Sequence, residues 1–146
     1  MRCLVCTIAV AFLSAFTVAA QDPAKPNLTG SWRLNTARSQ INATHVPGSW
    51  TIEESDGTIH ITESEGGKKI ELNCSTNGKE CDVTGGEKAR ASFWYNGPTL
   101  VEMETKGPNA TRYRMKLSPD GNALSVEVTY IVPQEGKSDT LVFEKQ

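Results

Sequence analysis

Short stretches of alternating apolar and polar residues follow one another from Ser49 to Gln146, separated by turns that contain glycine. The turns recur at roughly the eight-to-twelve-residue spacing of all-β barrels and sandwiches. Together with one earlier stretch, the pattern predicts ten strands, near residues 30–35, 49–54, 58–64, 68–74, 80–84, 88–95, 99–105, 111–117, 123–132 and 138–144. Residues 36–48 have room for one short helical turn at most.

One face of most of these stretches is apolar and the other is polar, which is typical of antiparallel strands that cover a core on one side. The stretch near 99–105 is predicted to place Val101 and Met103 inside the fold. Trp94 and Leu100 are then expected together on the outer face, either as a contact surface or beneath a covering loop.

The polar faces are predicted to carry charge pairs that set the register between strands. On this reading Glu102 lies opposite Arg114, and Glu104 lies between Arg90 and Arg112 on the solvent side. The alternative is an anion site built from the three arginines, which the interleaved glutamates disfavour.

The first twenty residues differ from this pattern. Arg2 precedes an uncharged apolar run, residues 4–18, and Val18-Ala19-Ala20 has the small side chains of a cleavage site. We expect residues 1–20 to be a signal peptide rather than a membrane span, and the protein to be exported to the periplasm or the medium. Residues 21–27 are then a flexible N-terminal segment and residues 28–146 a single β-barrel domain.

Two cysteines remain after removal of that signal, and they lie symmetrically about the hairpin turn Asn77-Gly78. Directly opposed residues of a hairpin are close enough for a disulfide, so we predict a Cys74–Cys81 bond. A redox or metal pair is the alternative, but further ligands and the close spacing of a CxxC motif are missing.

The segment Leu28-Thr29-Gly30-Ser31-Trp32-Arg33-Leu34 resembles the opening strand of the calycins, the superfamily of lipocalins, fatty-acid-binding proteins and avidins. The resemblance implies an up-and-down antiparallel meander of about 8–10 strands that closes into a barrel, with Trp32 closing one end. The whole mature chain also resembles small exported lipocalin-like barrels of bacteria.

The family's ligand-binding residues have no counterparts in this sequence. In fatty-acid-binding proteins an arginine and a tyrosine hold the ligand carboxylate, and these would fall at Leu141 and Phe143. The lipocalins' late arginine over the tryptophan could be replaced only by Lys137 or Lys145. The resemblance therefore predicts a fold and no specific ligand.

We expect a small apolar or amphipathic molecule in the barrel interior, although the same side chains could fill the barrel as a solid core. The candidate pocket residues are Trp32, Trp50, Phe93, Tyr95, Met103, Tyr113, Met115, Tyr130 and Phe143. The alternative is a protein-interaction module such as a barrel-type protease inhibitor, whose free N-terminal segment, residues 21–27, would enter the protease.

Catalysis is not expected, because no nucleophile elbow, metal-spaced histidine pair or phosphate-binding glycine loop is present. No cofactor or metal is predicted. A formal net charge of −2 without a basic block argues against nucleic acid as a partner, and a monomer is expected.

Overall fold

A computed structural model of the chain describes residues 24–133 and 136–146. These residues form ten β-strands and one 3₁₀ helix, η1. The bounds are β1 Gly30–Leu34, η1 Thr36–Arg38, β2 Ser49–Ser55, β3 Thr58–Glu65, β4 Lys68–Ser75, β5 Asn77–Thr84, β6 Ala89–Asn96, β7 Thr99–Lys106, β8 Asn109–Leu117, β9 Ala123–Val132 and β10 Ser138–Lys145. The predicted strands are all present, and their ends differ by a few residues.

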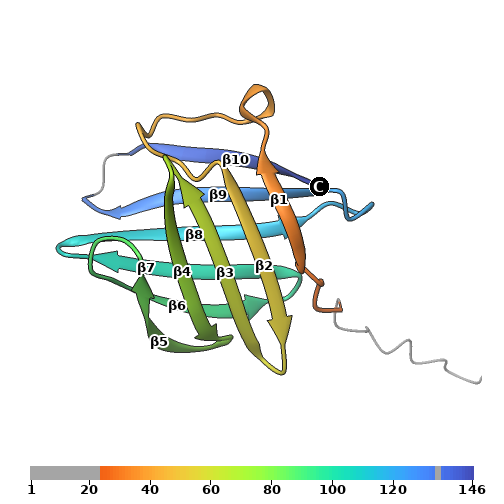
Figure 1. The fold of residues 1–146 in the computed structure, drawn as a ribbon, viewed down its shortest axis with the longest axis horizontal. Helices are drawn as coiled ribbons and strands as arrows, with labels where there is room; N and C mark the ends of the chain where they lie inside the picture. The colour runs from red at the N-terminus through yellow and green to blue at the C-terminus, as the bar shows by residue number, and fades with distance from the viewer. Residues whose placement is uncertain (1–23, 134–135) are drawn as a thin grey trace, which may run out of the picture.

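The strands form one closed antiparallel barrel in meander order, and β1 closes it by pairing with both β2 and β10. Figure 1 shows β2, β3 and β4 crossing in front of β7 to β10, so the barrel is flattened into two layers of differing strand direction. The all-β fold class and the up-and-down meander predicted from the sequence are confirmed.

Two tight turns fix the register of β7. Asn96 pairs with Thr99 around Gly97-Pro98, and Lys106 pairs with Asn109 around a second two-residue turn. The predicted pairing of Glu102 with Arg114, and of Glu104 with Arg90 and Arg112, requires connections of three residues, one more than either turn has. A shift of one residue moves every side chain of a strand to the opposite face.

The predicted faces of β7 are therefore wrong. Leu100 pairs with Tyr95 and Met115 and is buried in the core, whereas Val101 pairs with Trp94 and Arg114 on the outer face. Met103 is likewise on the outer face.

Glu102 and Glu104, predicted to face solvent, point into the barrel. The predicted outer charge pairs are replaced by other ones. Arg114 lies 3.8 Å from Glu127, and Arg90 lies 3.0 Å from Glu80.

A solid apolar core fills the end of the barrel where β1 begins. The Trp50 and Phe143 rings stack there with 4.4 Å between their centroids. The Trp32 indole Nε1–H donates to the Leu28 carbonyl at 3.0 Å, and the Lys145 ammonium lies 5.5 Å from the Trp32 ring. Trp32 thus closes this end, as the family resemblance implied, with a lysine over it in place of an arginine.

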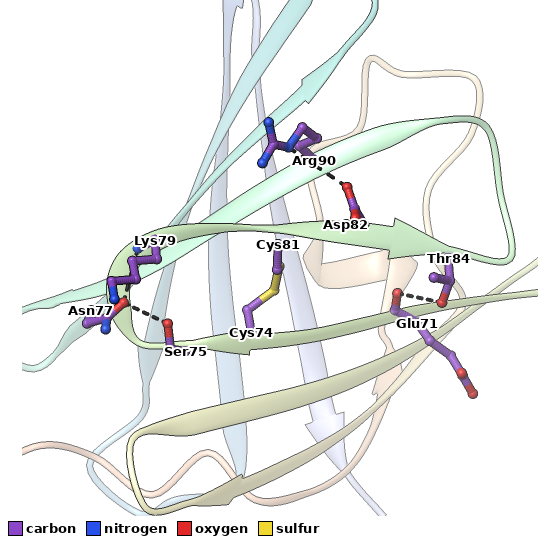
Figure 2. The surroundings of a disulfide bond; sticks show 9 residues. All are labelled: Glu71, Cys74, Ser75, Asn77, Lys79, Cys81, Asp82, Thr84 and Arg90. Carbon is purple, nitrogen blue, oxygen red and sulfur yellow. Dashed lines mark hydrogen bonds and ion pairs between the residues drawn. A yellow bond between two sulfur atoms is a disulfide. The ribbon is translucent and has the colours of Figure 1, made fainter.

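The predicted disulfide joins Cys74 of β4 to Cys81 of β5, with 5.5 Å between their Cα atoms (Figure 2). Asn77 shapes the adjoining turn: its side-chain oxygen accepts from the Ser75 hydroxyl at 2.6 Å and from the Lys79 amide at 3.1 Å. The bond pins this hairpin, whose ladder is otherwise short.

The predicted signal peptide, residues 1–20, and the first residues of the segment 21–27 lie outside the described residues. Within the described part, no helix has the length and apolar character needed to cross a bilayer.

Candidate ligand-binding cavity

The barrel interior differs between its two ends. The end that holds Trp32 is packed with apolar side chains that solvent does not reach. The other end, where the β7–β8 turn lies, contains a cavity of about 520 Å³ that opens to solvent. A volume of this size is within the range of small-molecule pockets in proteins. We call this cavity the polar cavity.

The polar cavity is built from the ends of three neighbouring strands and from two loops. Its residues are Glu104 and Lys106 of β7, Asn109, Thr111 and Tyr113 of β8, Tyr130 and Val132 of β9, Asn42 to His45 of the loop after η1, and Pro133 and Lys137. The alternation along β8 explains part of this wall, because Thr111 and Tyr113 are two residues apart and so share the inward face.

Three glutamates gather at the inner end of this cavity. Glu102 pairs with Tyr113 across the β7–β8 ladder, Glu104 pairs with Thr111, and Glu63 reaches in from β3 on the opposite wall. Glu102 is only 3 % exposed, and it makes no hydrogen bond or ion pair with any other residue of the described ranges. Glu63 and Glu104 remain partly accessible to solvent.

Burial and mutual repulsion raise the pKa of all three carboxyls. For Glu63 the main cause is burial among barrel atoms, followed by the charges of Glu104 and Glu65, and the pKa rises to about 8. Burial and then the charges of Glu63 and Glu104 raise the pKa of Glu102 well above its ordinary value. Burial raises the pKa of Glu104, while Lys106 opposes the rise.

The cations near the cavity mouth do not neutralise this cluster. The Lys106 ammonium lies 2.7 Å from the Glu87 carboxylate, and its charge opposes the rise in the pKa of Glu104 but is not among the causes that set the pKa of Glu63 or Glu102. The nearby Tyr113 hydroxyl has a pKa raised well above its usual range by burial and by the three glutamates, so it stays a neutral donor. The inner end of the polar cavity therefore has more carboxyl groups than cationic side chains.

The Trp50 indole also ends beside these carboxyls. Its Nε1 is buried and has no hydrogen-bond partner among the described residues. Trp50 is opposite Glu63 in the β2–β3 register, and it lies close enough to oppose the rise in the Glu63 pKa without meeting hydrogen-bond geometry. A buried donor without a partner costs free energy, so this part of the interior is not fully satisfied by the chain itself.

Asp139 fastens the loop that forms one side of the mouth. Its carboxylate accepts hydrogen bonds from the backbone N–H of Asn42 at 2.6 Å, from the backbone N–H of Ala43 at 3.3 Å and from the Tyr130 hydroxyl at 2.7 Å. Burial acts to raise the pKa of Asp139, but these hydrogen bonds prevail and lower it. The loop is thus tied to the barrel by an ionised carboxylate that is 1 % exposed.

The predicted pocket residues divide among four places. Tyr113 and Tyr130 line the polar cavity, and Met103 lies on the outer face. Tyr95 is near the closed end, where its hydroxyl donates to Glu54. The others are buried in the solid core: Trp32, Trp50, Phe93, Met115 and Phe143.

The acidic residues of the interior were not predicted as site residues. In the sequence, Glu102 and Glu104 have the alternating positions of a solvent-facing row on β7. Only the length of the turns before and after β7 shows that this row faces the interior. The one available signal was the Gly-Pro sequence at residues 97–98 and 107–108, which suits a two-residue turn.

Comparison with known proteins supports the fold. A fatty acid binding protein of Schistosoma mansoni, solved in complex with arachidonic acid, superposes with a TM-score of 0.64 and 14 % identity. The alignment covers 82 % of this chain and 96 % of that one. A second structure, described as the REP1-NXSQ fatty acid transporter, gives the same values.

The chain therefore shares the closed β-barrel fold of these two structures. No family model matches the sequence, and no curated protein matches it either. At this identity the likeness establishes the architecture alone. The positions that the resemblance assigned to a carboxylate clamp, Leu141 and Phe143, are buried apolar residues in the core.

Proposed function

We propose that this protein is an exported barrel that binds a small amphipathic molecule in the polar cavity. The observation that carries the proposal is the cavity itself, about 520 Å³ at the open end of a barrel whose other end is solid. Its wall combines the rings of Tyr113 and Tyr130 with a majority of polar and charged side chains, so it suits an amphipathic molecule better than a wholly apolar one. Structural neighbours described as fatty acid binding and transport proteins support a binding role rather than catalysis.

Filling the cavity from its wall tests this function. Thr111→Trp places a large ring on the inward face of β8, so we expect at least a tenfold loss of affinity for the uncharged dye Nile red, measured by fluorescence titration. Thr105→Trp is the matched control, because Thr105 lies on the exposed outer face of the adjacent strand. If Thr111→Trp leaves the affinity for Nile red unchanged, or if Thr105→Trp lowers it equally, the dye does not bind in the polar cavity and the proposal is wrong about the site.

Export is supported by the signal-peptide pattern of residues 1–20 and by the disulfide between Cys74 and Cys81, since disulfides persist in oxidising compartments. Intact mass spectrometry of the protein from its own host should give a chain that begins near Gln21 and is two hydrogens lighter than its reduced form. A full-length, reduced chain recovered from the cytoplasm would refute export.

The protease-inhibitor alternative gains no specific support. It requires a free N-terminal segment, whereas the Lys25 ammonium lies 4.4 Å from the Tyr95 ring and 4.0 Å from the Glu54 carboxylate. Leu28, three residues later, is buried in the core.

A further inference from the structure

The chemistry of the polar cavity is more specific than its shape. Of the groups that reach its inner end, three are carboxyls, one is a phenol and one is an indole N–H, and none is a cationic side chain. Isolated buried carboxylates are costly unless a cation is paired with them. Among the described residues, Lys106 acts on Glu104, and no cation is among the causes that set the pKa of Glu63 or Glu102.

Glu102 is the clearest sign that a partner is missing. It is almost completely buried, it points into the interior beside Tyr113, and it has no hydrogen bond or ion pair with another described residue. A side chain that served only to fill the core at this position would be apolar, like Leu100 two residues earlier on the same face.

The cavity gives solvent and small molecules access to these carboxyl groups. Glu104 lines it directly, and Glu63, which is partly accessible to solvent, and Glu102 lie behind the lining, close enough for the charges of the three to act on one another. A ligand that enters therefore meets Glu104 first, with two more carboxyls behind it. Tyr113 and Tyr130 stand beside this point, and aromatic faces attract cations at short range.

From this arrangement we infer that the ligand of the polar cavity is a small organic amine, with its ammonium group against Glu104 and Glu63 and its apolar body against Tyr113 and Tyr130. The inference rests on the proposed binding function and names its ligand class. A ligand with a carboxylate is disfavoured, because it would bring a further negative charge beside these carboxyls and would find no cationic side chain next to Glu63 and Glu102.

A set of three probes with the same ring and nearly the same length tests the charge of the ligand. They are 2-phenylethylamine, the uncharged 2-phenylethanol and the anionic 3-phenylpropanoate, each titrated calorimetrically at pH 7. We expect the amine to bind at least tenfold more tightly than the alcohol, and the carboxylate to bind more weakly than either.

Variants then locate the charge. Glu104→Gln should lower the affinity for the amine by about tenfold, the factor that corresponds to 1.4 kcal/mol, while affinity for the alcohol stays the same. Glu63→Gln should act in the same direction. Glu53→Gln is the control, since this glutamate lies on the outer face of β2, beside His60, and is 72 % exposed.

The outcomes separate the ligand class from the general function. If Nile red and the alcohol bind but the amine has no advantage, the inference is overturned and the binding function stands. If none of the probes binds, both fall. An amine advantage that Glu104→Gln and Glu63→Gln leave intact would also overturn the inference, because the charge would then be recognised elsewhere.

Discussion

At the scale of single residues, the protein keeps three glutamates inside a barrel where apolar side chains would be more stable. Protonation reduces this cost, since burial raises the pKa of Glu63 to about 8 and raises the pKa of Glu102 well above its ordinary value. Glu63 is therefore largely protonated in the empty barrel at pH 7, and a cation bound beside it would favour its ionised form.

This chemistry makes the stability of the empty protein depend on pH. A carboxyl whose pKa is raised by folding holds its proton in the native state after the unfolded chain has lost it. Below about pH 4.5 the Glu63 carboxyl is protonated in both the native and the unfolded state, and its contribution to stability is then most favourable. The free energy of unfolding falls as the pH rises from there toward about 8. The loss for one such group is at most about 1.4 kcal/mol per pH unit.

We expect Glu63→Gln to flatten this dependence and to stabilise the protein at pH 8, as measured by urea unfolding at several pH values between 5 and 8. The slope should not vanish, because Glu102 and Glu104 on β7 have raised pKa values too, while Glu65, Lys106 and Tyr113 are the other titratable groups close by. Glu53→Gln should leave the slope unchanged. An equal slope in Glu63→Gln and the parent protein would mean that this carboxyl is not protonated in the native state.

At the scale of elements, the register of each hairpin depends on its turn, and one turn depends on a neighbour outside its own hairpin. Gly85, in the connection from β5 to β6, has φ +87°, and a Cβ there would lie 2.1 Å from the Lys69 carbonyl oxygen of β4. Gly121, between β8 and β9, has a similar φ of +73° but open space around it.

Comparing Gly85→Ala with Gly121→Ala separates backbone strain from this close approach. Gly121→Ala should cost about 1–2 kcal/mol of unfolding free energy through its left-handed conformation alone. Gly85→Ala should cost clearly more, because the β5–β6 connection must also move away from β4. Equal losses in thermal or urea unfolding would show that the contact with Lys69 relaxes without cost.

The same scale shows what could be predicted from the sequence. Strand positions and their order follow from alternation and from glycine turns, which are local signals, and the interior residues that were named on β1, β2, β6, β8, β9 and β10 lie on the inward faces of their strands. Strand β7 was not, since it has apolar side chains on both faces, Leu100 on one and Val101 with Met103 on the other. Its face depends on a difference of one residue in turn length, which alternation does not report.

The candidate site could not be found for the same reason. Glu102 and Glu104 are typical of a solvated strand face when read alone, and only pairing with Phe93 and Ala91 turns them inward. Glu63, by contrast, continues the buried row of Ile59 and Ile61 on the inward face of β3. This continuation is a local hint of a polar interior that does not depend on turn length.

At the scale of the whole molecule, closure depends on β1, a strand of five residues that joins the two ends of the meander. The Gln146 amide donates to the Ser31 carbonyl at 2.9 Å, so the C-terminus ends beside the beginning of β1. Both lie away from the β7–β8 turn (Figure 1), at the end of the barrel that the apolar core fills. The polar cavity opens beside that turn, at the other end.

This placement has a practical consequence for anyone who wishes to immobilise the protein. A tether, affinity tag or fused reporter attached after Gln146 projects from the closed end and leaves the cavity mouth clear. Captured in that orientation on a sensor surface, every molecule presents its opening to the flowing solution.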